Sequence, residues 1–98
     1  MAEDGYVLRL FFAGHTGRSR AAVENLRTIC DRELAGQYRL ELIDVLEQPE
    51  LAEKYNIVAT PTLIKALPLP LRRIIGDLSD SERVLLGLDL RPRPMSMQ

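Results

Sequence analysis

The sequence predicts a small α/β domain, and three patterns within residues 1–45 support this prediction. Residues 6–12, YVLRLFF, form the short apolar and aromatic run of a buried strand. Residues 16–34 carry apolar side chains at helical spacing, and residues 38–45, YRLELIDV, alternate between apolar and polar as a strand does. A helix of this length between two strands is the usual crossover of a parallel, right-handed β-α-β unit.

The helix predicted over residues 16–34 has one apolar face and recognisable ends. Thr16 or Ser19 can cap its N-terminus, and Gly36 suits its C-terminal stop. The single cysteine, Cys30, falls on the apolar face, where a free thiol usually packs as a small hydrophobic group. The apolar face comprises Val23, Leu26, Cys30 and Leu34, with Ile29 beside them.

The strand predicted over residues 38–45 has two distinct faces, and a short helix follows it. One face carries Tyr38, Leu40 and Leu42, and the other carries Arg39 and Glu41. Residues 48–55, QPELAEKY, are predicted to form the helix, with Pro49 near its first turn.

The segment after Pro61 fits two kinds of local structure. Residues 62–67, TLIKAL, can form a strand, but most of them are also good helix formers. Residues 71–75, LRRII, fit either a short edge strand or one turn of helix. Pro68 and Pro70 end either kind of element.

The last patterned segment is also ambiguous. SDSE at 79–82 is a capping box, in which the Ser79 hydroxyl and the Glu82 carboxylate satisfy backbone N–H groups, and it predicts a helix over 80–88. The alternation of Leu86, Leu88 and Leu90 with Gly87 and Asp89 instead predicts a strand. The N-terminal half of the chain has no comparable ambiguity.

The composition is that of one small soluble domain. The chain has 98 residues, of which 46% are hydrophobic and 28% charged, and its formal net charge is −1. This charge argues against nucleic acid or an anionic membrane as the main partner. One cysteine and the lack of a signal-peptide or membrane-spanning pattern predict a cytoplasmic protein. We expect a single domain over residues 1–90 and a disordered tail over residues 91–98, RPRPMSMQ.

A proline motif relates these elements to a known frame. The stretch ATPTL at 59–63 follows a short amphipathic segment and resembles the proline loop of a thioredoxin fold, whose element order is βαβαββα. In that frame Thr16 and Ser19 occupy the positions of the two redox cysteines. Hydroxyls there cannot form a disulfide, so we expect them to cap the helix. His15 lies beside Ser19, but no orienting acid is near, so hydrolase chemistry is not expected.

Several longer runs resemble a single family. PLPLRRIIGDLSD at 68–80 and VLLGLDL at 84–90, together with ATPTL, AGHT at 13–16 and IDV at 43–45, resemble KaiB, the clock protein of the cyanobacterial Kai system and its bacterial homologues. The resemblance covers about residues 6–90. It implies a protein with no catalytic activity, no cofactor and no metal.

The resemblance also implies two folds for one chain. One is the thioredoxin-like βαβαββα monomer, which binds the ATPase ring of a KaiC-type protein and modulates its phosphorylation cycle. The other is a ground state of order βαββααβ, which keeps the N-terminal half and assembles into dimers and tetramers. Two such packings must lie within a few kcal/mol of each other. KaiA-type proteins and histidine kinases are further partners that the resemblance suggests.

Family resemblance assigns roles to individual residues. The KaiC-facing residues are Arg20, Asn56, Arg72 and Arg73, and the residues of the fold switch are Pro61, Gly87 and Asp89. Gly87 weakens a helix by about 1 kcal/mol relative to Ala. Core clock members often carry Arg at the position of Ala21 and Lys at the position of Asn56, so this chain departs from them at both positions.

Alternative functions stay open from the residues alone. One is a redox-inactive thioredoxin-like adaptor or stress-response module with a different partner. Another is an oxidoreductase that uses Cys30, which requires an exposed thiol near positive charge. A hard-metal site at Asp77, Asp80 and Glu82 lacks EF-hand spacing, and helix capping explains these acids better. The basic pairs Arg72–Arg73 and Arg91–Arg93 lack the aromatic side chains of a nucleic-acid surface and favour a protein partner.

Overall fold

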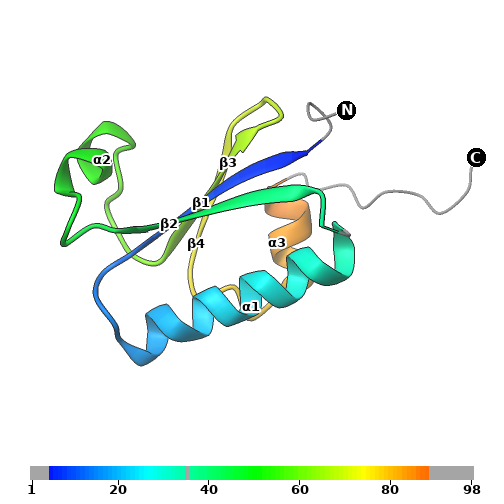
Figure 1. Ribbon diagram of the computed structural model, residues 1–98, viewed down its shortest axis with the longest axis horizontal. Helices are drawn as coiled ribbons and strands as arrows, with labels where there is room; N and C mark the ends of the chain where they lie inside the picture. The colour runs from blue at the N-terminus through cyan, green and yellow to red at the C-terminus, as the bar shows by residue number, and fades with distance from the viewer. Residues whose placement is uncertain (1–4, 35, 89–98) are drawn as a thin grey trace, which may run out of the picture.

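The chain folds in the predicted order βαβαββα (Figure 1). A computed structural model describes residues 5–34 and 36–88. The proposed tail over residues 91–98 and the alternating position Leu90 lie outside the described residues. The elements are β1 (Tyr6–Phe12), α1 (Gly17–Glu33), β2 (Tyr38–Asp44), α2 (Pro49–Lys54), β3 (Thr62–Leu67), β4 (Arg72–Ile75) and α3 (Ser81–Gly87).

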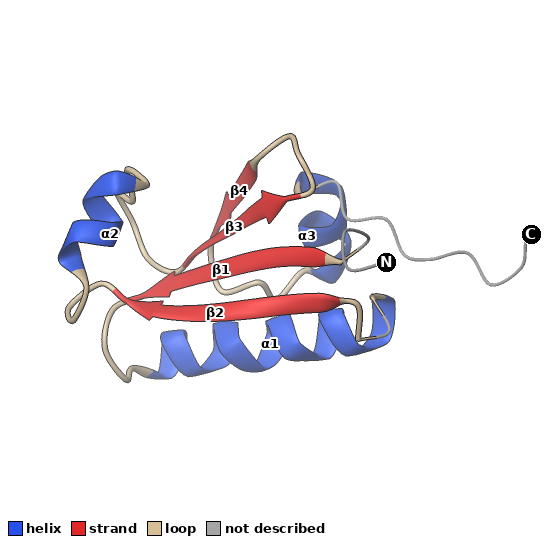
Figure 2. Cartoon of the chain, turned by 45° about the horizontal axis from the view of Figure 1, so that its top comes forward, coloured by secondary structure: helices blue, strands red, loops and turns tan. Residues whose placement is uncertain are grey.

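One four-stranded sheet of order β2-β1-β3-β4 organises the molecule (Figure 2). β1 and β2 are parallel, as the crossover helix predicts, and β3 is antiparallel to both β1 and β4. α1 and α3 cover one face of the sheet, whereas α2 lies at one end (Figures 1 and 2). None of the helices in the described part of the chain is long and apolar enough to cross a membrane.

The main core lies between the sheet and the two helices α1 and α3. It joins Leu8 and Leu10 of β1 to the apolar face of α1 and to the end of α3. The helix contributes Ala22, Leu26, Ile29, Cys30 and Leu34, and the α3 region contributes Val84 and Leu88. The sequence therefore predicted this helix face correctly, except that it missed Ala22.

A second, smaller core lies on the other face of the sheet. Phe11, Ile43 and Ile64 are buried there, with Leu51, Tyr55 and Ile57 of the α2 region packed against them. The alternation in β2 predicted Leu42 in an apolar face and gave no role to Ile43. In the structure Ile43 is buried, whereas Leu42 is 39% exposed and lines an open groove beside the start of α1.

β3 is a strand buried on both faces. Thr62, Leu63, Ile64 and Lys65 are all buried, because β3 runs between β1 and β4 with a core on either side. A strand in this position carries a continuous apolar run without alternation, and such a run also fits a helix. The same pairing makes the predicted edge strand of β4 the correct alternative for residues 71–75.

α3 confirms the predicted helix, but its cap differs from the predicted one. The capping box placed Ser79 at the N-cap, whereas in the structure Asp80 Oδ1 accepts a hydrogen bond from Arg83 N at 3.2 Å. Ser79 is instead held in the preceding turn, where its N–H donates to Asp77 Oδ1 at 3.1 Å. Leu88 is buried and Leu86 is 83% exposed, as a helix requires.

Gly87, the last residue of α3, lies close to β4. A Cβ at this position would lie 3.2 Å from Ile74 Cδ1, which is tighter than ordinary van der Waals contact. Glycine therefore allows the end of α3 to approach β4 closely, while it weakens the helix by about 1 kcal/mol relative to Ala.

We predict that the effect of Gly87→Ala on stability depends on Ile74. Ala gains helix propensity but presses on Ile74 Cδ1, so Gly87→Ala should be more favourable by roughly 0.5–1 kcal/mol in an Ile74→Val background. Chemical denaturation of the four variants of this double-mutant cycle measures the coupling. Equal effects of Gly87→Ala in both backgrounds would show that the contact has no energetic weight.

Candidate partner-binding surface

The position of the thioredoxin dithiol is occupied by a helix cap. Thr16 Oγ1 accepts a hydrogen bond from Ser19 N at 3.1 Å and donates one to Ser19 Oγ, also at 3.1 Å. This cap satisfies one of the free N–H groups of the first turn of α1. Ser19 is buried and His15 is exposed. The expected capping role is confirmed for Thr16, whereas Ser19 contributes the backbone N–H that is capped.

The thiol of Cys30 is inaccessible. Cys30 is fully buried in the main core, and burial raises the pKa of its thiol from 9.0 to about 12. A thiol without thiolate character or exposure is a poor nucleophile and a poor redox centre. The hypothesis of a Cys30-dependent oxidoreductase therefore lacks the exposed thiol that it requires.

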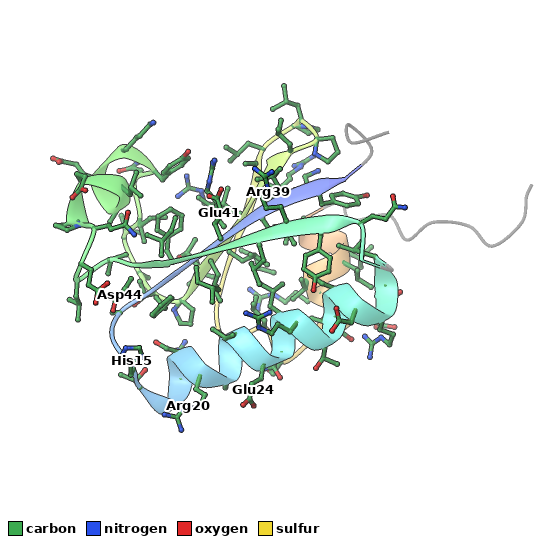
Figure 3. The ribbon with its side chains drawn as sticks, viewed as in Figure 1. His15, Arg20, Glu24, Arg39, Glu41 and Asp44 are labelled. Carbon is green, nitrogen blue, oxygen red and sulfur yellow. The ribbon has the colours of Figure 1, made fainter. Side chains whose placement is uncertain are left out.

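An apolar groove runs beside the capped end of α1. Its volume is about 280 Å³, and Phe12, His15, Ser19, Arg20, Val23 and Leu42 are among its lining residues. Figure 3 shows His15, Arg20 and Glu24 along the N-terminal part of α1. Asp44 fixes the loop above the groove, because its Oδ1 accepts from Gly14 N at 3.1 Å and from Leu46 N at 2.9 Å. Arg20, a predicted partner-binding residue, is thus exposed on the rim of a groove.

The proline loop joins α2 to β3 and is tied to β4. Pro61 is buried, the Thr60–Pro61 peptide bond is cis, and Pro61 O accepts from Gly76 N at 3.0 Å. Thr62 Oγ1 donates to Ala59 O at 2.6 Å. Val58, just before this turn, is 83% exposed. The loop therefore presents an apolar side chain to solvent on a fixed backbone.

Asn56 ends α2 in a Schellman-type turn. Its φ is +59°, in the left-handed region, Asn56 N donates to Glu53 O at 3.1 Å, and Ile57 N donates to Ala52 O at 2.8 Å. These bonds satisfy carbonyls of the last helical turn. Asn tolerates left-handed backbone better than other side chains except Gly. The predicted partner-binding residue at position 56 is thus also the stop signal of the helix.

The structure separates the predicted arginine pair. In β4, the guanidinium of Arg73 donates to Tyr55 O at 2.8 Å and to Asn56 O at 3.2 Å. Arg72 is exposed and, by strand alternation, points to the other side of the sheet. Arg73 and Asn56 therefore lie together, Arg72 is adjacent on the opposite face, and Arg20 lies apart on α1. Asp89, a predicted switch residue, is outside the described residues.

A polar network that sequence analysis missed lies next to this region. Arg9 Nε donates to Glu41 Oε1 at 2.7 Å and Arg9 Nη1 donates to Tyr55 Oη at 2.7 Å, while the guanidinium lies 5.4 Å from the centre of the Tyr55 ring. The hydrogen bond to Glu41 raises the pKa of Arg9. The signal was present, because Arg9 interrupts an apolar run and faces Glu41 in register. Figure 3 shows Glu41 on β2.

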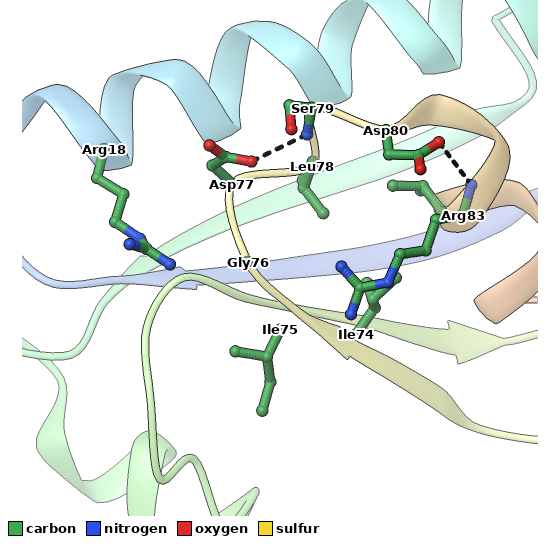
Figure 4. Close-up of a pocket in the computed structure, with 10 residues that line it drawn as sticks. Arg18, Ile74, Ile75, Gly76, Asp77, Leu78, Ser79, Asp80 and Arg83 are labelled. Atoms are coloured by element: carbon green, nitrogen blue, oxygen red, sulfur yellow. Dashed lines mark hydrogen bonds between the residues drawn. The ribbon is translucent and has the colours of Figure 1, made fainter.

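The acidic loop before α3 serves the backbone. Figure 4 shows Asp77 bonded to Ser79 and Asp80 bonded to Arg83, around a pocket of about 150 Å³ that Arg18 and Gly76 also line. The hydrogen bond from the Ser79 hydroxyl lowers the pKa of Asp77 the most, and the hydrogen bond from the Ser79 backbone lowers it further. Within the described residues no group of three or more His, Cys, Asp or Glu side chains is placed to hold a metal ion. Capping, as the sequence suggested, accounts for Asp80 here.

The fold and the cap together define a thioredoxin-like protein without a redox-active dithiol. Among solved structures, the chain is similar to the N-terminal domain of Synechococcus elongatus SasA, at a TM-score of 0.72 and 26% identity, covering 96% of this chain and 90% of that one. It is also similar in fold to the thioredoxin Deadhead of Drosophila melanogaster, at a TM-score of 0.71 and 19% identity, covering 91% and 84%.

The family itself is shown by sequence. The KaiB domain model matches residues 9–90. The chain is 53% identical to circadian clock protein KaiB3 of a Synechocystis strain, covering 94% of this chain and 90% of that protein. It is 60% identical to circadian clock oscillator protein KaiB of a Synechococcus strain, covering 87% and 77%. The chain belongs to the KaiB family, which is not an enzyme family, and the predicted family is confirmed.

We predict that Cys30 lowers the stability of the fold at high pH. The pKa of the Cys30 thiol is about 12 in the folded chain, and it is 9.0 when the thiol is not buried, as in the unfolded chain. The stability that the neutral thiol contributes is fully present below pH 9.0 and is lost as the pH rises toward about 12. Urea denaturation at several pH values between these limits gives the free energy of unfolding. This free energy should fall more steeply with pH for the wild-type chain than for Cys30→Ala. Equal slopes would contradict the burial of the thiol.

We also predict that position 56 selects for left-handed backbone. Asn56→Lys should destabilise the fold by about 1 kcal/mol, because Lys is strained at the positive φ of this position. Asn56→Gly should be neutral or slightly stabilising. Thermal or urea unfolding of both variants gives the comparison. A Lys variant as stable as the Gly variant would refute the assigned turn.

Proposed function

We propose that this chain is a non-enzymatic regulatory protein that docks on the ATPase ring of a KaiC-type protein and modulates its phosphorylation cycle. Family membership over residues 9–90 supports this proposal, and the matched relatives are named as circadian clock proteins. The observation that carries it is the replacement of the dithiol by the Thr16–Ser19 cap in a complete thioredoxin-like frame. This frame presents the groove beside α1 and the exposed Val58, and it lacks the dithiol of a thioredoxin.

The docking surface combines the groove at α1 with the loop after α2. Arg20 contributes a cation at the rim of the groove, and Asn56 lies at the start of the exposed loop that leads to Pro61. Leu42 and Val58 add apolar side chains that are 39% and 83% exposed. Apolar contact area with a cationic rim suits a partner surface that is apolar at its centre and acidic at its edge.

In this proposal the chain has two alternative folds, and the fold described here is the one that binds the partner. The ground state, of order βαββααβ, rearranges the half after Pro61 and assembles into dimers and tetramers. Pro61 marks the boundary, Gly87 weakens α3, and Asp89 belongs to the switch. If the binding fold is the minor one, the apparent affinity falls in proportion to its population. KaiA-type proteins and histidine kinases are further partners in a cytoplasmic setting.

A second candidate rests on the departures from core clock members. This chain has Asn56 and Ala21 where those members often carry Lys and Arg. With two fewer cations on the docking surface, a different partner is favoured. The chain would then be a redox-inactive thioredoxin-like adaptor or a stress-response module.

We predict that the chain forms a large complex with a KaiC-type ATPase in the presence of ATP. Size-exclusion chromatography should show the complex increasing over hours of incubation, because the binding fold must first be populated. Arg20→Glu should weaken the complex at least roughly tenfold, since it reverses a charge at the rim.

The matched control is Arg27→Glu, which makes the same charge change at an exposed position further along α1. It should leave the complex unchanged. The absence of any complex after prolonged incubation of the wild-type chain would reject the KaiC-type partner and favour the adaptor. Equal weakening by both variants would reject the assigned surface.

A further inference from the structure

Arg73 donates hydrogen bonds within the chain, although the family resemblance assigns it to a partner. Its two guanidinium nitrogens donate to Tyr55 O at 2.8 Å and to Asn56 O at 3.2 Å. These carbonyls belong to the C-cap and to the left-handed residue that follow α2. Arg73 itself lies in β4, about 17 residues further along the chain. The contact therefore joins two segments that no strand pairing joins.

The two carbonyl oxygens of this contact suit the planar, positively charged guanidinium of an arginine. The carbonyls at a helix C-terminus lack partners within the helix and carry the negative end of its dipole. Arginine presents several N–H groups in a rigid plane, so that one side chain reaches two neighbouring carbonyls. The Schellman-type bonds of Asn56 N and Ile57 N serve carbonyls within the last turn, and Arg73 bonds the carbonyls of Tyr55 and Asn56, just beyond that turn. The carbonyls of Tyr55 and Asn56 therefore receive these two side-chain bonds only when β4 is in place.

Arg72, the neighbouring residue, is a natural comparison. It is exposed, it lies opposite Lys65 in the β3–β4 pairing, and its side chain points to the other face of the sheet. Within residues 5–34 and 36–88, no hydrogen bond or ion pair involves its side chain. The two arginines have the same side chain and are adjacent in the sequence, but they differ in their contacts.

We infer that Arg73 is a positioning residue that holds the end of α2, and with it Asn56 and the loop to Pro61, once β4 has formed. Arg72 is the arginine of the pair that is free to meet an acidic group of a partner. The arrangement makes the geometry of the docking loop conditional on the formation of β4. Its relevance to docking rests on the proposed function, whereas the intramolecular clamp does not.

The clamp is tested in the free protein by amide hydrogen exchange. Arg73→Ala should accelerate exchange at Asn56 and Ile57 roughly three- to tenfold, because the turn that protects these amides loses two charge-assisted bonds. Arg73→Lys should give a smaller acceleration, because an ammonium group does not span both carbonyls as a fork does. Arg72→Ala should change the same amides by less than about twofold.

Reference amides in the main core separate local from global effects. Leu10 in β1 and Leu26 in α1 should keep their protection in Arg73→Ala. Unchanged exchange at Asn56 and Ile57 in Arg73→Ala would overturn the inference, and so would an equal loss of protection at the loop and in the core.

Binding to the KaiC-type ATPase then separates the two arginines. Arg73→Ala should weaken binding and also accelerate amide exchange at Asn56 and Ile57. Arg72→Ala should weaken binding and leave these exchange rates unchanged. Full binding by Arg72→Ala would overturn its assignment as the partner-facing arginine. If the wild-type chain binds no such ATPase, the proposed function fails, while the exchange rates still decide whether Arg73 clamps the loop.

Discussion

The structure depends on the need to cover both faces of the central strands β1 and β3. Leu10 and Leu63 point toward α1 and α3, whereas Phe11 and Ile64 point to the opposite side. Within residues 5–34 and 36–88, α1 and α3 cover the first face, and only α2 and its loop pack beside the buried residues of the second. That face is consequently closed by a small apolar cluster and by polar contacts around Tyr55. The loop after α2, one part of the surface proposed for docking, continues from this cover, since Tyr55 and Ile57 pack in the second core and Val58 is exposed.

Much of the fold could be predicted from the sequence, because local pattern and tertiary role agree in the first half. β1 is a short apolar run, α1 has one apolar face, β2 follows it as a strand, and their order and direction were predicted correctly. The second half resisted prediction for a physical reason. β3 is buried on both faces, so it lacks alternation, and β4 has only four residues. Only pairing with β1, which is distant in sequence, makes TLIKAL a strand in this fold. The N-cap of α3 was misplaced because the turn before it uses Asp77 to hold Ser79.

The candidate site was predictable as a set of residue types and less so as an arrangement. The loss of the dithiol was visible in Thr16 and Ser19, and the capping role of Thr16 followed from ordinary helix chemistry. The contact of Arg73 with the carbonyls after α2 was not visible, since it depends on the backbone conformation of Asn56 and on the register of β4. The pairing of Arg9 with Glu41 was equally long-range, although an arginine inside an apolar strand is a signal that such a partner exists.

The placement of Cys30 has a consequence for the conditions to which the chain responds. Thioredoxins report the thiol–disulfide balance of their surroundings, because their reactive sulfur lies at the surface. In this chain the same frame keeps its one sulfur under α1, neutral and closed to oxidants. The one thiol of the chain is therefore shielded from oxidants as long as the domain stays folded. The frame on which thioredoxins carry an exposed, reactive sulfur here carries a sulfur that reacts only after the domain opens.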